Sequence, residues 1–565
     1  MKIKRFFETL PVVAALLLTA SCTNEDNDML VPQPETPAVK TIPFTVTVST
    51  STDTRATLAD TYNGYVFAEG DALYVQDASG DVYGRLTLDS GEGTGNATFS
   101  GELNYTGSEP EATLALTAVL KGKDDVIVQV ENDKVTDIVY PADAIQQSGS
   151  APVVAVASLQ DAIQNFSYFK GTATYGAPSF TLEQQSAFLH FSISVANIDV
   201  YEKLYIDLSV VNNVSEDNPN GEVISYWFLE LDEDGKTEFY TALASGTKLE
   251  NAEIMPWIPV TEQCPNIKFG DGIQLEANRV YKVTKRLVDL SWIKSDFEAQ
   301  NGDVLFGWLA AAYYFDNFDE VEFKNHVISI PANAKVTLSN AIINLDDFSG
   351  LNLPGITCEG DATIILDGEN GVIASGGPGI FVASGNTLTI KGTGELEVSG
   401  GTIENETNST YQGAAGIGSG YGEECGNIVI LEGIIEAIGG YGAPGIGSGM
   451  NGTCGDITFS GGDITAYAGE AAPTAIGIGT DGECTSVTIG KNISSIAMTN
   501  YDATDKTVSS FIYATNIYAQ GSSTTQDITS YAALDVDNPY ITMGMTGVGL
   551  TSSYDSGSNK WTVSK

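Results

Sequence analysis

A glycine-rich phrase that recurs in the second half of the chain constrains the fold most strongly. Each copy is followed by one cysteine, and these cysteines fall 29 and then 30 residues apart. A looser copy begins at Gly377. A fixed period of this size indicates stacked units, none of which buries its apolar face alone. The three close copies are Gly416-Ile417-Gly418-Ser419-Gly420 with Cys425, Gly445-Ile446-Gly447-Ser448-Gly449 with Cys454, and Gly477-Ile478-Gly479-Thr480 with Cys484.

The segments between the glycines have the pattern of short strands. Asn427 to Leu431 and Ile434 to Ala437 are strand-like, and no apolar period of helix length interrupts them. Short strands, glycine corners and a coil of about 30 residues predict a parallel β-helix. We expect it to span residues 301–495, with residues 496–565 forming a C-terminal β cap or extension over its open end.

Composition places the whole chain in the all-β class and restricts its partners. The 565 residues include 60 glycines, and 73 acidic against 26 basic residues give a net charge of −47. A surface this acidic repels phosphate backbones, so nucleic acid is excluded as a partner. The charge has two interpretations, namely solubility alone or cation binding by acidic patches.

The N-terminus has the features of an export signal. A basic start at Lys2, Lys4 and Arg5 precedes an apolar run too short to cross a bilayer. The run ends at Cys22 in a sequence similar to a bacterial lipobox, which predicts a lipoprotein signal peptide over residues 1–21 and acylation of Cys22. Residues 22–40 form an acidic and Pro-rich tether. We expect a lipid-anchored protein at the outer-membrane surface; the alternative is plain secretion with an incidental cysteine.

The three repeat cysteines are expected to stack on successive coils. They recur at the repeat period, and neighbouring backbones in such a stack lie about 4.8 Å apart. A buried ladder of small apolar thiols is the favoured interpretation, and a disulfide between two neighbours is the alternative. Zinc is not expected, because the sequence has no Cys-x-x-Cys pair and only two histidines.

The first half of the chain is rich in alternating strands separated by Gly, Asn and Asp turns, which favours β-sandwiches. Three of its phrases are Phe67-x-x-Gly70-Asp71-x-Leu73, Gln185-x-Ala187-Phe188-Leu189 and Asn278-Arg279-Val280-Tyr281. These phrases resemble the fimbrillin superfamily. That resemblance implies two transthyretin-like sandwiches, expected at residues 41–165 and 166–300, and a precursor of surface pili.

The fimbrillin resemblance also assigns a role to Arg55, the only arginine between Arg5 and Arg85. It implies that a trypsin-like protease cuts between Arg55 and Ala56, removing the first strand so that a strand of the next subunit takes its place. The alternative is an ordinary exposed loop residue.

The repeats offer little to a catalytic mechanism. Between residues 350 and 490 the only basic residue is Lys391, whereas lyases use Arg or Lys as base and charge stabiliser. The acidic residues form no recognisable glycosidase pair. The repeats also resemble a β-helix family of carbohydrate-binding domains, and that resemblance implies calcium-assisted binding of acidic polysaccharide; from the residues themselves we expect no cofactor and no catalytic residue.

Together these observations predict a fimbrial subunit or tip adhesin, with the β-helix as its outward binding head. Its partners would be other fimbrial subunits, a glycan or protein ligand, and the membrane through the lipid anchor. The alternative is a surface protein that binds or processes carbohydrate and uses the sandwiches as spacers.

Overall fold

A computed structural model of the chain describes its elements within residues 38–50, 65–123, 125, 127–140, 156–196, 205–212, 222–232, 235–250, 252–257, 267–270, 272–310, 323–346, 351–405, 410–500, 511–521, 525–527, 548–555 and 560–565. The expectations for the signal peptide, Cys22, Arg55 and Ala56 lie outside these ranges. Strands dominate what is described, which confirms the all-β class. No helix within these ranges is long and apolar enough to cross a membrane.

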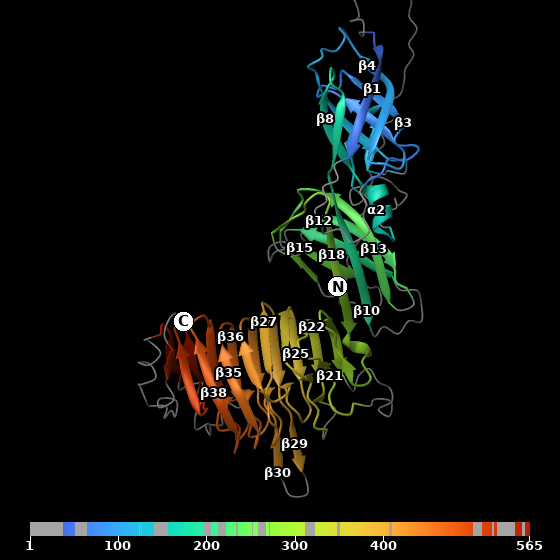
Figure 1. Cartoon of the computed structure of the whole chain (residues 1–565). Helices are drawn as coiled ribbons and strands as arrows, with labels where there is room; N and C mark the ends of the chain where they lie inside the picture. Colours follow the sequence, from blue (N-terminus) through green and yellow to red (C-terminus); the bar gives the residue numbers. More distant parts are fainter. Residues whose placement is uncertain are drawn as a thin grey trace, which may run out of the picture.

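The first unit is a closed sheet of seven strands in the order β1-β4-β3-β2-β5-β8-β9 (Figure 1). The expectation of a two-sheet sandwich at residues 41–165 is therefore corrected in two respects. The sheet closes because β1 pairs with both β4 and β9, and it runs on to Gln184. Its strands are β1 Lys40–Thr50, β2 Ala72–Gln76, β3 Tyr83–Ser90, β4 Asn96–Tyr105, β5 Ala115–Lys121, β8 Phe169–Thr174 and β9 Ser179–Gln184.

The second unit contains the sheet β13-β10-β18 and a separate sheet β12-β11-β15-β16. The helix α2, Leu159–Phe166, is capped by Ser158 and contacts β10 and β13. Two further two-stranded sheets, β6–β7 and β14–β17, are separate from both of these sheets. The strands are β6 Val128–Glu131, β7 Lys134–Ile138, β10 Ser186–Ala196, β11 Tyr205–Asn212, β12 Glu222–Glu230, β13 Lys236–Ala244, β14 Lys248–Leu249, β15 Ala252–Trp257, β16 Ile267–Gly270, β17 Ile273–Gln274 and β18 Val280–Asp289.

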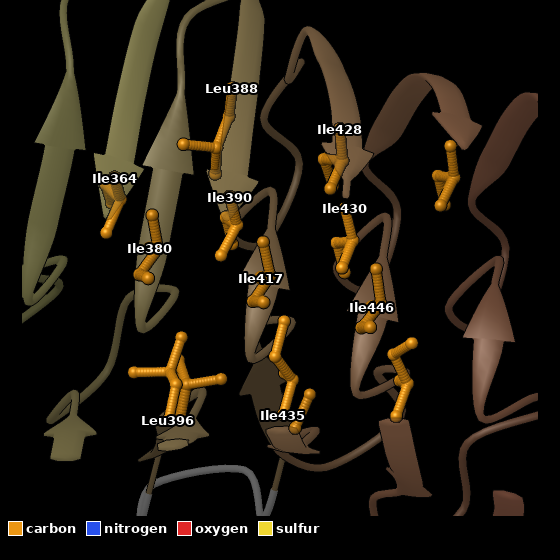
Figure 2. Packing of buried hydrophobic residues seen from close by; sticks show 14 of the residues in the cluster. Ile364, Ile380, Leu388, Ile390, Leu396, Ile417, Ile428, Ile430, Ile435 and Ile446 are labelled. Atoms are coloured by element: carbon orange, nitrogen blue, oxygen red, sulfur yellow. The ribbon is translucent and has the colours of Figure 1, made fainter. Parts of the chain in front are cut away.

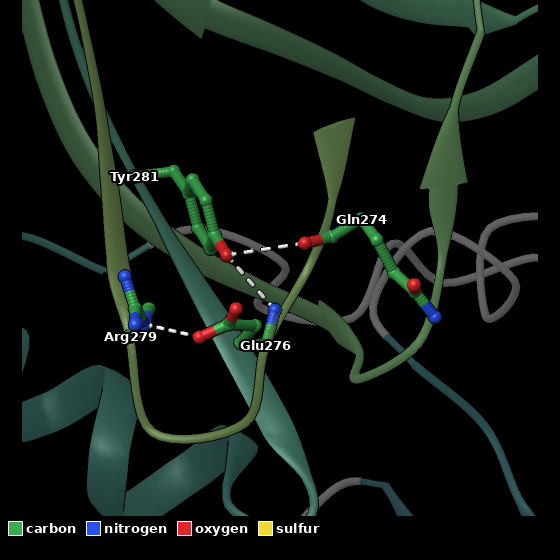
Figure 3. A network of polar contacts seen from close by, with 4 residues as sticks. All are labelled: Gln274, Glu276, Arg279 and Tyr281. Atoms are coloured by element: carbon green, nitrogen blue, oxygen red, sulfur yellow. Dashed lines mark hydrogen bonds and ion pairs between the residues drawn. The ribbon is translucent and has the colours of Figure 1, made fainter. Parts of the chain in front are cut away.

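The turn that leads into β18 is held by polar contacts from the phrase Asn278 to Tyr281 (Figure 3). The Tyr281 hydroxyl accepts from the Glu276 backbone N–H at 2.8 Å and donates to the Gln274 carbonyl at 3.4 Å. Arg279 forms an ion pair with Glu276 across the turn. Asn278 has a φ of 58°, a left-handed conformation that asparagine tolerates better than most residues. These contacts fix where β18 begins.

The third unit is a stack of parallel strands in three columns. The first column is β24-β27-β32-β35-β38-β40, the second β25-β28-β33-β36-β39, and the third β19-β21-β23-β26-β31-β34-β37. Strands β20 and β22 start the stack. The bounds of the strands in this unit are β19 Phe297–Glu298, β20 Val304–Ala310, β21 Ile328–Ile330, β22 Lys335–Asn344, β23 Ile356–Cys358, β24 Ala362–Asp367, β25 Glu369–Ile373, β26 Ile380–Val382, β27 Thr387–Gly392, β28 Glu395–Ser399, β31 Ile417–Gly418, β32 Asn427–Ile430, β33 Ile434–Ile438, β34 Ile446–Gly447, β35 Thr453–Phe459, β36 Asp463–Ala468, β37 Ile476–Gly477, β38 Glu483–Gly490, β39 Ser495–Asn500 and β40 Asn516–Gln520.

Inward side chains of the three columns form continuous apolar ladders (Figure 2). Ile364 lies opposite Ile390, which lies opposite Ile430, and all three are fully buried. Ile380, Ile417 and Ile446 form the matching ladder of the third column. Since each coil covers the apolar residues of its neighbours, the core is a property of the stack rather than of one repeat.

Both ends of the stack are closed by other strands. At the far end β39 and β40 remain parallel to the coils, so the stack continues past residue 495. Three antiparallel strands then follow: β41 Thr525–Asp527, β42 Thr551–Asp555 and β43 Lys560–Ser564, with Trp561 and Val563 buried. At the near end β18 of the second unit pairs with β20. A hairpin, β29 Thr402–Asn405 and β30 Thr410–Gly413, projects from one coil (Figure 1).

The third glycine copy aligns differently from the sequence expectation. Ile446-Gly447 lies opposite Ile476-Gly477, so Ala475-Ile476-Gly477, not Gly477-Ile478-Gly479, repeats the start of the earlier phrase. The reason is burial, because Ile476 is fully buried in the third column whereas Ile478 is half-buried. Gly477 therefore corresponds to Gly418 and Gly447.

Replacing Gly447 by Ala should destabilise the stack severely. Its φ is +142°, and an added Cβ would lie 2.0 Å from the Gly477 carbonyl oxygen. We expect a loss of about 3 kcal/mol in the free energy of unfolding, from backbone strain and overpacking together. The control is Gly385→Ala, with φ +82° and open space around the added Cβ, which should cost about 1 kcal/mol. Equal losses in chemical denaturation would contradict the close stacking of coils at Gly447.

Candidate functional site

The first strand is bonded along both of its edges. β1 pairs antiparallel with β4 from Lys40↔Tyr105 to Ser49↔Asn96, and parallel with β9 from Thr47↔Ser179 to Thr50↔Leu182. Alternate side chains of β1, at Phe44, Val46 and Val48, are buried in the core of the closed sheet. Removal of β1 would therefore expose two rows of backbone hydrogen-bonding groups and an apolar slot.

Side-chain contacts add to the shorter of these two pairings. The Thr47 hydroxyl donates to the Ser179 hydroxyl at 3.0 Å, and the Ser49 hydroxyl donates to the Thr181 hydroxyl at 3.3 Å. The Thr50 N–H donates to the Gly95 carbonyl at 2.9 Å as the strand ends. β1 ends at Thr50, and Arg55 follows five residues later in the sequence. The expected cleavage point therefore comes shortly after the strand that closes the sheet.

The repeat glycines allow unusually close contact between backbones. Gly418, Gly447 and Gly477 lie in line with φ values of +147°, +142° and +112°. A Cβ on Gly418 would lie 1.7 Å from the Gly447 carbonyl oxygen. Of the other predicted glycines, Gly416, Gly420, Gly445, Gly449 and Gly479 would likewise bring a Cβ within 2.8 Å of neighbouring atoms. These residues shape the stack and offer no chemistry of their own.

Two buried serines bond one coil to the next. The Ser419 hydroxyl accepts from the Gly449 N–H at 2.9 Å, and the Ser448 hydroxyl accepts from the Gly479 N–H at 3.1 Å. Both serines are fully buried. In the third copy Ile478 takes the place of the serine. Sequence reasoning did not single out these serines, although their position in the repeated phrase was visible.

The repeat cysteines lie inside the stack as free thiols. Cys425, Cys454 and Cys484 are all buried, and Cys454 lies directly opposite Cys484. Hydrogen bonding with Cys425 and with Cys484, together with burial, raises the pKa of the Cys454 thiol well above its usual value. A thiol held in its neutral form is a poor nucleophile and a poor metal ligand. The arrangement therefore favours packing as the role of these residues.

The carboxylates of the stack are dispersed. The Asp456 carboxylate accepts from the Ser486 hydroxyl at 2.6 Å, and Asp463 accepts from the Ser495 hydroxyl. Within the described ranges no three His, Cys, Asp or Glu side chains gather as a metal site would require. Calcium binding, which the carbohydrate-binding resemblance implies, therefore finds no preformed site among those residues.

A groove of about 520 Å³ runs along one corner of the stack. It lies where the first column turns into the second, and its volume is within the range of small-molecule sites. The exposed side chains of Leu431 (37%) and Ile434 (48%) contribute its apolar surface. Glu432 and Asp463 contribute carboxylates, and backbone groups come from the glycine turns. The lining residues are Gly392, Thr393, Leu431, Glu432, Gly433, Ile434, Ser460, Gly461, Gly462, Asp463, Asn492 and Ser494.

The groove was not predicted from the sequence. The available signal was weak: Leu431 and Ile434 are apolar residues at outward positions beside a glycine turn. The corresponding positions on neighbouring coils, such as Ser460 and Asp463, are polar. The lining residues lie together only because of the register of the coils, which places four turns between Gly392 and Ser494 at one corner.

No family model and no curated protein matches the chain. Parts of it are similar to solved structures. A fimbrial assembly protein from Parabacteroides distasonis is 11% identical, with 43% of this chain and 91% of that chain covered and a TM-score of 0.23. The fimbrial anchor protein Mfa2 from Porphyromonas gingivalis is 14% identical, covering 38% of this chain and 78% of its own, with a TM-score of 0.21. A fimbrial protein from Bacteroides ovatus is 12% identical, with 43% of this chain and 49% of that chain covered and a TM-score of 0.20. Each likeness spans less than half of this chain, whose function must be inferred from its own residues.

Proposed function

We propose that this chain is a cell-surface lipoprotein of the fimbrial type, acting as a pilus subunit or tip adhesin. Acylated Cys22 anchors it to the outer membrane before assembly. The stack of coils is a parallel β-helix and serves as the outward binding head. The observation that carries the assembly role is the double pairing of β1, because a removable strand with two bonded edges is what strand exchange between subunits requires.

The strand-exchange step has a defined course. A protease cuts between Arg55 and Ala56, and β1 then leaves the closed sheet. The apolar slot that held Phe44, Val46 and Val48 becomes available together with the bonding edges of β4 and β9. A strand from the next subunit fills the slot, which removes the cost of unpaired backbone groups.

Cleavage at Arg55 should convert a monomer into a species that polymerises. Trypsin-treated full-length protein should form oligomers in size-exclusion chromatography or take up a synthetic peptide of residues 40–50, because its open slot gains a partner strand. Arg55→Ala should not be cut at this site, should keep β1 attached and should remain monomeric. The matched control is Arg85→Ala, since Arg85 lies exposed on β3 and its loss leaves the Arg55 site intact. Cut protein that stays monomeric and captures no strand would overturn the pilus role.

A carbohydrate ligand in the corner groove is the second part of the proposal. Aliphatic side chains at Leu431 and Ile434 suit the C–H face of a sugar ring, and the oxygens of Glu432 and Asp463 suit hydroxyl donors. These carboxylates repel uronates, so we infer a neutral glycan rather than an acidic one. The chain then binds without catalysing a reaction. If the closed sheet and the second unit only space the head from the membrane, this binding function remains.

Removing the apolar surface of the groove should weaken glycan binding. We expect the double variant Leu431→Ser, Ile434→Ser to bind the strongest neutral oligosaccharide from an array about tenfold more weakly, given the loss of apolar contact. Tyr513→Ser is the control, because Tyr513 is an exposed apolar residue (45%) outside the groove lining. Unchanged binding in the double variant, or preference for uronate-rich glycans, would contradict this assignment.

A further inference from the structure

The connection between the closed sheet and the second unit is short and lies between two buried residues, Gln184 and Ser186. β9 ends at Gln184 and β10 begins at Ser186, so a single residue, Gln185, connects them. The Gln185 N–H donates to the Tyr168 carbonyl at 2.6 Å. The buried Ser186 hydroxyl donates to the Phe166 carbonyl at 2.8 Å, and the Gln184 side-chain amide donates to the Ser167 hydroxyl at 2.7 Å. These bonds hold the joint in one geometry.

Strand β10 then lies parallel to β18 over nine residue pairs, from Phe188↔Val280 to Ala196↔Val288. The Phe188 N–H donates to the Arg279 carbonyl at 2.8 Å, and the Asn278 N–H donates to the Ser186 carbonyl at 2.9 Å. Both strands run from the closed sheet toward the stack (Figure 1). Between them in the chain, the structure describes β11 to β17, of which β13 pairs with β10.

The far end of β18 is fixed to the stack. Leu287 to Asp289 pair with Val304 to Phe306 of β20. The 3₁₀ helix η1, Leu290–Trp292, follows β18 directly, and β19 lies between η1 and β20. Arg286 Nη1 lies 2.8 Å from the carboxylate of Asp303, which is only 1% exposed. The same carboxylate accepts from the Gln300 N–H at 2.8 Å, and the Asp303 carbonyl accepts from Thr337 at 2.9 Å. A partly buried ion pair, whose carboxylate is also hydrogen-bonded, therefore holds this second joint.

We propose that β10 and β18 form a shear clamp that carries tension between the membrane-proximal sheet and the stack. The start of β10 is attached to the closed sheet, and the end of β18 is attached to the stack. Tension therefore slides two parallel strands past each other and loads all bonds of their ladder at once. The described strands between them in sequence, β11 to β17, stay outside the load path until the ladder breaks. The inference rests on the proposed function, because tension arises only when the protein, held at its N-terminal unit by the lipid or by a neighbouring subunit, grips a ligand.

Load direction alone should decide the mechanical strength of this unit. Full-length protein would carry site-specific handles at the exposed residues Glu183 and Ser295, which flank the clamp. Forced unfolding reports the barrier to unfolding, so we expect a high rupture force in single-molecule pulling. Unfolding of the chain between the two handles should add on the order of 350 Å of extension, since an extended chain spans at most about 3.6 Å per residue.

The control uses handles at Glu183 and Glu276, which lie near the starts of β10 and β18. Here the same ladder is peeled one bond at a time, and the rupture force should be several-fold lower. Equal forces in the two directions, or a low force in the first, would overturn the clamp. The handles apply the load themselves, so failure of lipidation, cleavage or glycan binding would overturn the proposed function and leave this result unaffected.

Discussion

Backbone hydrogen bonding between neighbouring parallel strands is the interaction on which the rest of the structure depends. It sets the register of the coils, so that Ile364, Ile390 and Ile430 meet in one buried ladder. The same interaction joins β10 to β18 and β18 to β20, which makes the second unit continuous with the stack. Each coil needs a neighbour to satisfy its backbone groups, and the ends of the stack are accordingly covered by β18 and β43.

Close coil contact also restricts what this part of the chain can do. Glycines fill the positions where backbones approach, and buried serines and thiols fill the spaces between coils. Burial keeps these groups away from solvent in the described interior of the late coils, so any ligand must be recognised on the outside. The corner groove is such a surface. Glycines without side chains form much of its turns, and the side chains of Leu431 and Ile434 are exposed there.

The repeat period could be predicted from the regular spacing of the glycine phrases and cysteines. The all-β class could be predicted from the short alternating strands between turn residues. Register could not be predicted at the third copy, where Gly477-Ile478-Gly479 imitates the earlier phrase two residues too late. The choice was made by burial of Ile476 in a column formed by residues distant in sequence. Closure of the first sheet was missed for the same reason, since the β1–β9 pairing joins strands more than a hundred residues apart. The groove combines four corners from separate coils, which no local pattern encodes.

We infer that the closed sheet, the second unit and the stack form one rigid load path through Gln185 and β18. The most direct measurement is pulsed electron paramagnetic resonance between spin labels at Asp89, exposed on β3, and Glu395, exposed on β28. Fixed joints predict one narrow distance distribution in solution. A broad distribution, as expected for units connected by flexible linkers, would contradict the account.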